Sequence, residues 1–284
     1  MRRFEGRTIL ITGAARGQGA SHARAFVSEG ARVVLGDIRE ALGRMLADEL
    51  GADAHFVALD VARVADWAAA VDEAERRFGP ISILVNNAGF CRDRMIFNMT
   101  EEDFDAVLRV HVKGSFCSLK FASIYWRQRA KSTGGPVYGR IIGTSSEAFL
   151  YCSVGQPNYA AGKAGITALT LSTGHAVLKY GVTANVICPR ARTRMTDTGG
   201  MLSEMFAKPE AGFDTFDPAN IAPFVAYLAS PAAENISGQV FTCCGENITV
   251  VGRPDITQPE SQFHNEGTWT AEKLDQQIGP YFAK

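Results

Sequence analysis

Hydrophobic residues along the chain gather in short runs separated by longer segments of helical periodicity. The runs lie at residues 7–12, 31–37, 54–60, 81–87, 139–145, 181–187 and 238–243. Each run is mostly β-branched or aliphatic and is bounded by Gly, Asp, Asn or Pro. Continuous apolar runs, as opposed to alternating ones, suit strands buried on both faces of a parallel sheet. The pattern therefore predicts seven parallel strands.

The segments between the runs are long enough for the crossover helices that parallel strands require. Apolar residues recur at helical spacing in 21–31, 64–79 and 101–128. The alternation predicts one doubly wound α/β domain over residues 1–250, with a seven-stranded parallel sheet and helices on both faces.

Two segments interrupt this alternation. Residues 190–217 follow the sixth predicted strand and are rich in Met, Phe and Gly. Ligands of open α/β sheets bind at the carboxyl ends of strands, so this segment is predicted to be a substrate lid. The alternative is an ordinary surface loop.

Residues 251–284 are polar and proline-containing, and they are predicted to form a C-terminal extension over this domain or a neighbouring subunit.

Composition excludes several partners. The formal net charge is −1 and the pI is about 6.5, which gives no basic excess for nucleic acid or an anionic membrane surface. The six cysteines form no CxxC pair and no cluster with zinc spacing, so we expect no metal and a reducing compartment. The apolar run at the N-terminus is too short for a signal sequence or a membrane span. These features predict a cytoplasmic protein.

A glycine-rich loop, TGAARGQG, occupies residues 12–19, directly after the first predicted strand and before the first helix. Glycines allow a tight turn and bring backbone N–H groups close to a pyrophosphate, which the start of a helix favours. The predicted cofactor contacts in this loop are Gly13, Arg16, Gly17, Gln18 and Gly19.

Polar residues end the next three strands. Asp37 ends the second, where a carboxylate accepts ribose hydroxyls and repels a 2′-phosphate, so it favours NAD over NADP. Arg16 and Arg39 are evidence to the contrary, because either could pair with that phosphate. The third and fourth strands end in predicted adenosine contacts, namely Asp60, Val61, Asn87, Ala88 and Gly89. Asp60 is expected to accept from the adenine amino group.

These motifs and YAAGK at 159–163 occur in the order found in the short-chain dehydrogenase/reductase family, which residues 4–250 resemble. The resemblance implies a Rossmann fold, a nicotinamide cofactor and a homotetramer. It also implies that Ser146, Tyr159 and Lys163 are catalytic, that Tyr159 and Lys163 contact the cofactor, and that Pro189 and Thr193 do so after the sixth strand.

The spacing of Tyr159 and Lys163 has a chemical reason. Residues i and i+4 share one helix face. Tyrosine titrates near about 10, and a neighbouring ammonium lowers that value, so we expect Lys163 to depress the pKa of Tyr159. Tyr159 then exchanges a proton with a substrate oxygen that Ser146 holds. The small residues between them, and Ala164, Gly165 and Ala168 beyond, leave room for the cofactor and for a paired helix.

One motif departs from the wider family and narrows the resemblance. His111 occupies the place of an asparagine that supports a proton relay in many relatives, so His111 is a fourth candidate catalytic residue. It could bond the same backbone groups or be a core histidine. VHVKGSF at 110–116 and the segment 188–196 resemble the (3R)-hydroxyacyl-CoA dehydrogenase modules of peroxisomal multifunctional enzymes, also described as 17β-hydroxysteroid dehydrogenases. Glu147 and Ala148 depart from that pattern.

The sequence thus predicts NAD-dependent, reversible oxidation of a secondary alcohol, with a 3-hydroxyacyl-CoA or a steroid-like alcohol as substrate. An NADPH-dependent 3-oxoacyl reductase and a non-catalytic dinucleotide sensor are the alternatives. Apolar lid side chains are expected to cover the substrate, with 149–151 as the opposite wall, and one of three arginines is expected to meet a coenzyme A phosphate. The lid side chains are Met195, Met201, Leu202, Met205, Phe206, Phe213 and Phe216, and the arginines are Arg190, Arg192 and Arg194.

Overall fold

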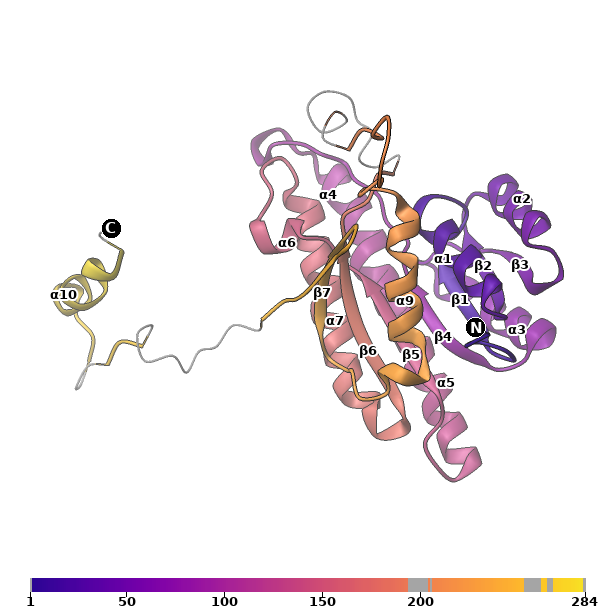
Figure 1. Ribbon diagram of the computed structural model, residues 1–284. Coiled ribbons are helices and arrows are strands. Elements are labelled where there is room, and N and C mark those ends of the chain that lie inside the picture. The colour runs from indigo at the N-terminus through magenta and orange to yellow at the C-terminus, as the bar shows by residue number, and fades with distance from the viewer. Residues whose placement is uncertain (1, 194–203, 205, 253–261, 265–267, 283–284) are drawn as a thin grey trace. The chain divides into compact units, whose positions relative to one another are not determined.

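An eight-stranded sheet in the order β3-β2-β1-β4-β5-β6-β7-β8 organises the larger part of the protein (Figure 1). The computed structural model describes residues 2–193, 204, 206–252, 262–264 and 268–282. The chain divides into two compact units, Met1–Val251 and Gly252–Lys284. In the second unit, α10 (Ala271–Phe282) brings Tyr281 edge-on to Phe263, with ring centroids 5.5 Å apart.

Seven parallel strands follow the predicted runs closely, and helices connect them. The strands are β1 Thr8–Thr12, β2 Arg32–Asp37, β3 Ala54–Ala58, β4 Ile81–Asn86, β5 Gly139–Thr144, β6 Val182–Pro189 and β7 Val240–Cys244. The main helices of the first unit are α1 Gly17–Ser28, α2 Glu40–Leu50, α3 Val64–Phe78, α4 Glu101–Leu108, α5 Gly114–Thr133, α6 Ala148–Tyr151, α7 Pro157–Val177 and α9 Ala222–Ala229. The predicted doubly wound α/β class is confirmed.

The predicted strand count was wrong by one. An eighth strand, β8 (Asn247–Val250), pairs antiparallel with β7, and Phe241 faces Val250 across the ladder. All four β8 residues are exposed, and polar and apolar side chains alternate along it. Such an edge strand lacks the continuous apolar run that marked the buried strands.

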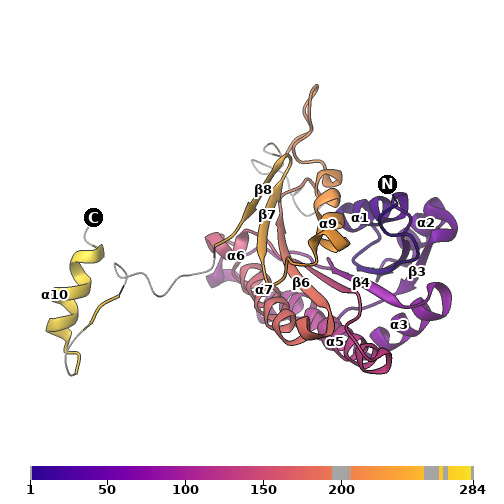
Figure 2. The same ribbon diagram turned by 60° about the horizontal axis from the view of Figure 1, so that its bottom comes forward.

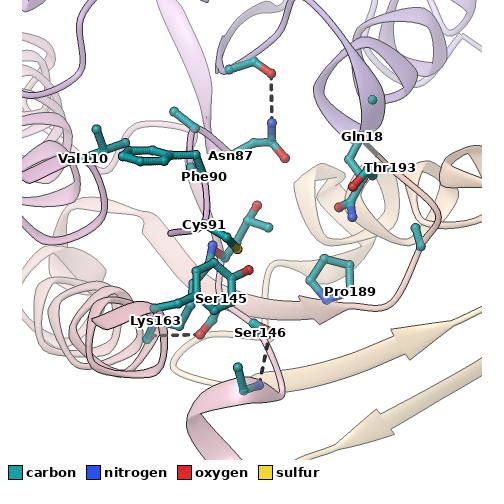
Figure 3. Close-up of a pocket in the computed structure, with 18 of the residues that line it drawn as sticks. Gln18, Asn87, Phe90, Cys91, Val110, Ser145, Ser146, Lys163, Pro189 and Thr193 are labelled. Carbon is teal, nitrogen blue, oxygen red and sulfur yellow. Dashed lines mark hydrogen bonds between the residues drawn. The ribbon is translucent and has the colours of Figure 1, made fainter. Parts of the chain in front are cut away.

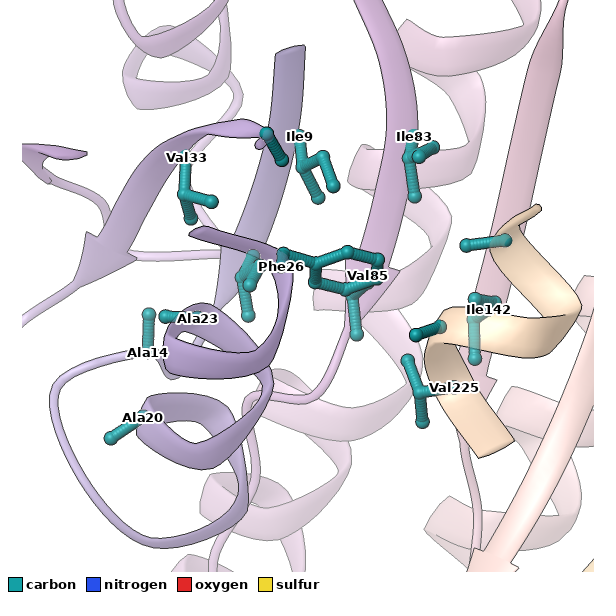
Figure 4. Packing of buried hydrophobic residues seen from close by; sticks show 14 of the residues in the cluster. Ile9, Ala14, Ala20, Ala23, Phe26, Val33, Ile83, Val85, Ile142 and Val225 are labelled. Carbon is teal, nitrogen blue, oxygen red and sulfur yellow. The ribbon is translucent and has the colours of Figure 1, made fainter. Parts of the chain in front are cut away.

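Two hydrophobic layers, one on each face of the sheet, hold the elements together. Because side chains alternate along a strand, Ile9 and Ile11 of β1 face one layer and Leu10 faces the other. Phe26 of α1 and Val225 of α9 belong to the first layer (Figure 4), and residues of α3, α5 and α7 fill the second. Figure 2 shows α1, α2 and α9 on one side of the sheet and α3, α5 and α7 on the other.

The helix predicted over 101–128 is interrupted by a π-helical turn. Thr100 caps α4 by accepting a hydrogen bond from Asp103 N, but after Leu108 the backbone widens into a π turn, Arg109–Lys113, before α5 begins. Apolar periodicity gives no sign of this one wide turn. Single π turns in helices are frequent at functional sites, and this one carries His111.

Candidate active site

A cavity of ≈ 890 Å³ opens at the carboxyl ends of the parallel strands (Figure 3). Fourteen of the fifteen predicted cofactor contacts line it, together with Ser146. Gly19 and His111 do not line it, and each lies directly behind the wall. Among the described residues, no cluster of His, Cys, Asp or Glu is placed to hold a metal ion. Nor does any described helix have the length and apolar content needed to cross a membrane.

The glycines of the first loop allow unusually close backbone approaches. Gly13 has φ +62°, and a Cβ there would lie 2.7 Å from Ala88 Cα. A Cβ on Gly19 would lie 2.2 Å from Gly13 O and 2.8 Å from Asn87 Nδ2. Real side chains cannot adopt such contacts, so Gly19 serves the packing of the loop against the end of β4 and does not face the cavity.

Asn87 ties the glycine-rich loop to the end of β4. Its side-chain Nδ2 donates to Gly13 O at 3.0 Å and to Thr12 O at 3.2 Å, and its backbone N donates to Thr12 Oγ1 at 3.0 Å. Ala88 N donates to the same hydroxyl at 3.1 Å. Asn87 therefore fixes the loop, a role that its sequence position did not reveal.

The start of α1 fits an anionic group. Arg16, the N-cap residue, makes no side-chain hydrogen bond that caps the helix. The side-chain oxygen of Gln18 lies buried at the cavity wall with no partner among the described residues. Uncapped N–H groups at a helix start favour phosphate, so the loop and α1 suit the pyrophosphate of a dinucleotide.

Asp37 is held rigidly at the end of β2. The residue is buried, with 7% of its surface exposed. Its Oδ2 accepts from Ala15 N at 3.0 Å and its Oδ1 from Arg39 N at 2.9 Å. Each carboxylate oxygen keeps a second lone pair, so Asp37 can still accept hydroxyl groups. Arg16 and Arg39 also line the cavity.

Ser146, Tyr159 and Lys163 meet where β5 and α7 converge. Pro157 stands in the first turn of α7, where its missing N–H costs nothing. Lys163 Nζ donates to Thr144 O at 2.8 Å and lies 5.3 Å from the centre of the Tyr159 ring. Ser146 Oγ accepts from Ala148 N at 3.2 Å. The structure thus brings all three predicted catalytic residues together.

The ionisation of this group differs from the prediction. Burial raises the pKa of Tyr159 above its usual value, and the hydrogen bond with Ser146 only partly offsets that rise. Burial lowers the pKa of Lys163 to about 8. The protein chain by itself therefore does not show the expected lowering of the Tyr159 pKa, because burial of the phenol disfavours its charged form.

His111 is packed between two glycines behind Tyr159. A Cβ on Gly89 would lie 2.5 Å from the imidazole, and one on Gly162 would lie 3.0 Å from His111 Cβ. The imidazole meets the Tyr159 ring edge-on, with centroids 5.4 Å apart. Its Nε2 lies 2.9 Å from Phe90 O, and its Nδ1 is buried without a partner among the described residues. Burial and the charge of Lys163 lower the pKa of His111 to about 3, so the ring is neutral.

The predicted lid is described only in part. Arg194, Met195, Met201, Leu202 and Met205 lie outside the described residues. Phe206 lines the cavity and packs on Phe216 at 4.6 Å between ring centroids, whereas Phe213 is exposed. These aromatic residues therefore lie in different environments.

Two arginines of this segment are already paired. Arg190 donates to Glu147 from Nε at 3.0 Å and also from Nη2, and Arg192 pairs with Asp214. Arg192 Nη1 also donates to Phe206 O at 2.9 Å, so Arg192 joins the start of the segment both to its middle and, through Asp214, to its end. A coenzyme A phosphate would have to compete with a carboxylate at either arginine.

The wall opposite the lid also differs from the expectation. Of residues 149–151 only Tyr151 lines the cavity, and it is largely exposed. Phe149 turns away and packs against Val186 and Cys188 of β6. The short helix α6 places these side chains in different directions, which a three-residue sequence stretch does not indicate.

Several cavity residues were not singled out from the sequence. Cys91 and Asp93 follow β4, and Asp93 accepts from Gln156 Nε2 at 2.9 Å. Arg109 Nη2 donates to Asp60 Oδ2 at 2.6 Å. Only the tertiary fold brings these side chains together, and no local motif marks them.

Comparison with known proteins agrees with this geometry. The family model described as short chain dehydrogenase matches residues 7–203. Hydroxyacyl-CoA dehydrogenase ChsB1 of Mycobacterium tuberculosis is 45% identical, over 99% of this chain and 90% of that protein. Peroxisomal multifunctional enzyme type 2 of Drosophila melanogaster is 34% identical over 94% of this chain, which spans 45% of that longer protein.

Two solved structures share the fold. A short chain dehydrogenase from Mycobacterium avium is 40% identical with a TM-score of 0.85, covering 99% of this chain and 94% of that one. The 3-ketoacyl-(acyl-carrier-protein) reductase from Brucella melitensis complexed with NADH is 27% identical with a TM-score of 0.75, covering 84% and 96%. The resemblance inferred from the motifs is confirmed: the chain belongs to the short-chain dehydrogenase/reductase family, oxidoreductases that act on CH–OH groups with a nicotinamide dinucleotide.

Proposed function

We propose that this protein is an NAD-dependent dehydrogenase that reversibly oxidises the secondary alcohol of a 3-hydroxyacyl-CoA or a steroid-like molecule. The observation that carries the proposal is the cluster of Ser146, Tyr159 and Lys163 on the wall of a cavity whose other end begins at the glycine-rich loop. The bound nicotinamide would supply the hydride acceptor or donor.

The three side chains would bind the substrate oxygen, exchange the proton and hold the nicotinamide ribose. Because Ser146 Oγ accepts from Ala148 N, its hydroxyl proton is turned toward other acceptors, and we assign it to the substrate oxygen. Tyr159 would exchange the proton with that oxygen. Lys163, fixed by Thr144 O, would hold the nicotinamide ribose and keep positive charge beside the phenol.

At neutral pH Tyr159 is protonated, and its raised pKa strengthens that state. A phenol is ready to donate a proton to a carbonyl oxygen during reduction. In oxidation Tyr159 would need its pKa lowered, which the positive charge of an oxidised nicotinamide favours. His111, being neutral and buried, would position Tyr159 and the Phe90 backbone and would not itself carry the proton.

Asp37 supports NAD over NADP. Two backbone N–H groups hold its carboxylate in place, and a fixed carboxylate at this strand end repels a 2′-phosphate. The NADH complex of the Brucella melitensis reductase shows that this fold accepts NADH in that relative. Arg16 and Arg39 remain the basis of the alternative, an NADPH-dependent 3-oxoacyl reductase.

Replacement of Asp37 tests the cofactor. Charge-assisted hydrogen bonds are worth about 1.5–3 kcal/mol, so Asp37→Ala should shift the ratio of kcat/KM for NAD⁺ and NADP⁺ toward NADP⁺ by about 10- to 100-fold. Asp48→Ala, an exposed change in α2, is the matched control. A wild-type protein that prefers NADP⁺ would contradict the assignment.

The substrate class is supported by the relatives and by the cavity wall. One relative is a hydroxyacyl-CoA dehydrogenase and another is a peroxisomal multifunctional enzyme. We propose that residues 190–217 close over the substrate, with Phe206 as one contact. A panel of a short secondary alcohol, a 3-hydroxyacyl-CoA and a steroid alcohol, followed at the nicotinamide absorbance, tests this. Equal turnover of the short alcohol would contradict a pocket for large substrates.

The non-catalytic sensor is the second candidate, and the same panel addresses it. A sensor would bind dinucleotide without turning over any of the alcohols. Retention of Ser146, Tyr159 and Lys163 on one cavity wall, with Tyr159 and Lys163 buried, favours the enzyme.

We also propose a cytoplasmic homotetramer. Ala161, Ala164 and Ala168 face outward along α7, and on α5 Phe116 and Ile124 are exposed. Gly165 has a different role, because a Cβ there would lie 2.9 Å from Val112 of the same chain. Light scattering at micromolar concentration should report four chains, and Ala164→Arg should reduce that mass. A wild-type monomer would contradict the proposal.

A further inference from the structure

An ion pair that no motif marks lies on the cavity wall where β3 ends. Arg109 Nη2 donates to Asp60 Oδ2 at 2.6 Å, although 49 residues separate the two in the chain. Asp60 follows β3, and Arg109 is the first residue of the π turn between α4 and α5. Both side chains line the cavity, together with Leu59, Val61 and Val110.

The carboxylate of Asp60 is fixed from several directions. Its Oδ1 accepts from Ala62 N at 3.0 Å, and its own backbone N donates to Asp66 Oδ2 at 3.1 Å. Burial raises the pKa of Asp60, but the hydrogen bonds from Arg109 and Ala62 outweigh that effect and hold the pKa below its usual value. Asp60 therefore presents an ionised acceptor in one orientation.

Arg109 adds donors directly beside that acceptor. A guanidinium carries five N–H groups, and only one hydrogen bond, from Nη2 to Asp60, is described for this one. An acceptor and a donor side by side are what the amide of Asn or Gln offers to the amino group and N7 of adenine. The Asp60–Arg109 pair offers the same pattern from two side chains.

The ordinary alternative is a surface ion pair of little consequence. The Arg109 side chain is 48% exposed, and exposed pairs contribute only about 0–1 kcal/mol to folding. Two observations argue against that alternative here. Both partners line the cavity. The carboxylate of Asp60 is also held in one orientation by hydrogen bonds from Ala62 N and Arg109, as recognition of a ligand requires.

We propose that Arg109 is a cofactor-recognition residue, which donates a hydrogen bond to a ring nitrogen of adenine next to the amino group that Asp60 accepts from. This inference rests on the proposed function in one respect: it requires that an adenine dinucleotide binds in this cavity. It does not depend on the choice between NAD and NADP, since both carry adenine.

The test measures equilibrium binding by fluorescence titration and needs no turnover. The ligands are NADH and its 1-deaza- and 7-deaza-adenine forms, each lacking one ring nitrogen. The proteins are wild type, Arg109→Met and Arg44→Met, the last removing an exposed arginine of α2 that pairs with Glu40 outside the cavity. Arg109→Leu, which also carries no hydrogen-bond donor, replaces the Met variant if thermal unfolding shows that the Met variant is not folded.

For wild type and Arg44→Met, one deaza form should bind about tenfold more weakly than NADH. For Arg109→Met, NADH itself should bind about tenfold more weakly, and that deaza form should bind as well as NADH. Wild-type protein that binds all three ligands alike, or a deaza effect that survives in Arg109→Met, would overturn the proposal. Failure of wild type to bind any dinucleotide would instead refute the proposed function itself.

Discussion

The two ends of the cavity are built in different ways. At the phosphate and ribose end of the cofactor half, formed by the loop 12–19, Asp37 and Asn87, almost every described contact involves a backbone atom: Asn87 bonds Gly13 O, and Asp37 accepts from Ala15 N. In the substrate half, formed by 147–151, 190–193 and 206–216, pairs of side chains such as Glu147 with Arg190 add to backbone contacts such as that of Arg192 with Phe206 O. Where backbone atoms make the contacts, few residue types fit each position. Where side chains pair with each other, one pair can be replaced without disturbing the rest of the site.

The largest effect that tests this comparison is expected at Tyr159, where the cofactor half and the substrate half of the cavity meet. Tyr159→Phe keeps the ring against His111 and removes only the hydroxyl. General acid–base groups contribute about 10²- to 10⁴-fold, so kcat should fall by that much while NADH affinity stays the same. Steady-state kinetics and a fluorescence titration measure the two effects.

Tyr151→Phe is the matched control for Tyr159→Phe. It removes a hydroxyl that also lines the cavity but is largely exposed. Its kcat should stay close to that of wild type. A Tyr159→Phe variant with more than about a tenth of wild-type kcat would contradict the assignment.

In the cofactor half, we expect the largest loss of stability when a glycine of the loop is replaced. In Gly19→Ala the new Cβ would lie 2.2 Å from Gly13 O, a backbone atom that cannot move without disturbing the loop. Overpacking of this kind costs about 1–3 kcal/mol or more, so we expect the upper end, about 3 kcal/mol, in the free energy of unfolding. NADH affinity should fall with it.

Gly135→Ala controls for the substitution itself, because nothing lies within 4 Å of its new Cβ. Urea unfolding of the two variants compares the costs. Equal stability of Gly19→Ala and Gly135→Ala would mean that the loop is not held by close backbone contact.

The same contrast explains what the sequence revealed. Strands β1 to β7 were predictable because buried parallel strands need continuous apolar runs. Gly13, Asp37 and Asn87 could be placed around one cavity because each ends or follows a parallel strand, although the bond from Asn87 to the loop could not be foreseen. The exposed strand β8 and the π turn at Arg109 left no such signature. The pairs Asp60–Arg109 and Glu147–Arg190 join residues more than 40 positions apart, and only the fold reveals them.

His111, which packs against Tyr159 between the two halves, should make the stability of the protein depend on pH. Its folded pKa is about 3, whereas an unfolded histidine titrates near about 6.5. The unfolded chain therefore binds a proton that the folded chain does not, and stability falls as pH drops from about 6.5 toward 3. At pH 5 this one residue accounts for about 2 kcal/mol of the loss.

His111→Asn removes that titration. Between pH 7.5 and pH 5 its free energy of unfolding should fall by about 2 kcal/mol less than that of wild type, measured by urea unfolding. His175→Asn, near the exposed end of α7, should behave as wild type. An identical pH dependence of wild type and His111→Asn would show that the imidazole is not buried as described.

The smallest effect is expected in the substrate half. Arg190→Met removes a pair whose side chains are 45% and 21% exposed, so the free energy of unfolding should change by less than about 1 kcal/mol. Arg24→Met removes a comparable exposed pair with Glu49 outside the cavity and should cost as little. Because Arg190 and Glu147 line the cavity, only Arg190→Met should change the KM of the alcohol, by a few-fold, with NADH affinity unaltered. If Arg190→Met weakens NADH binding instead, the Arg190–Glu147 pair belongs to the cofactor half of the cavity.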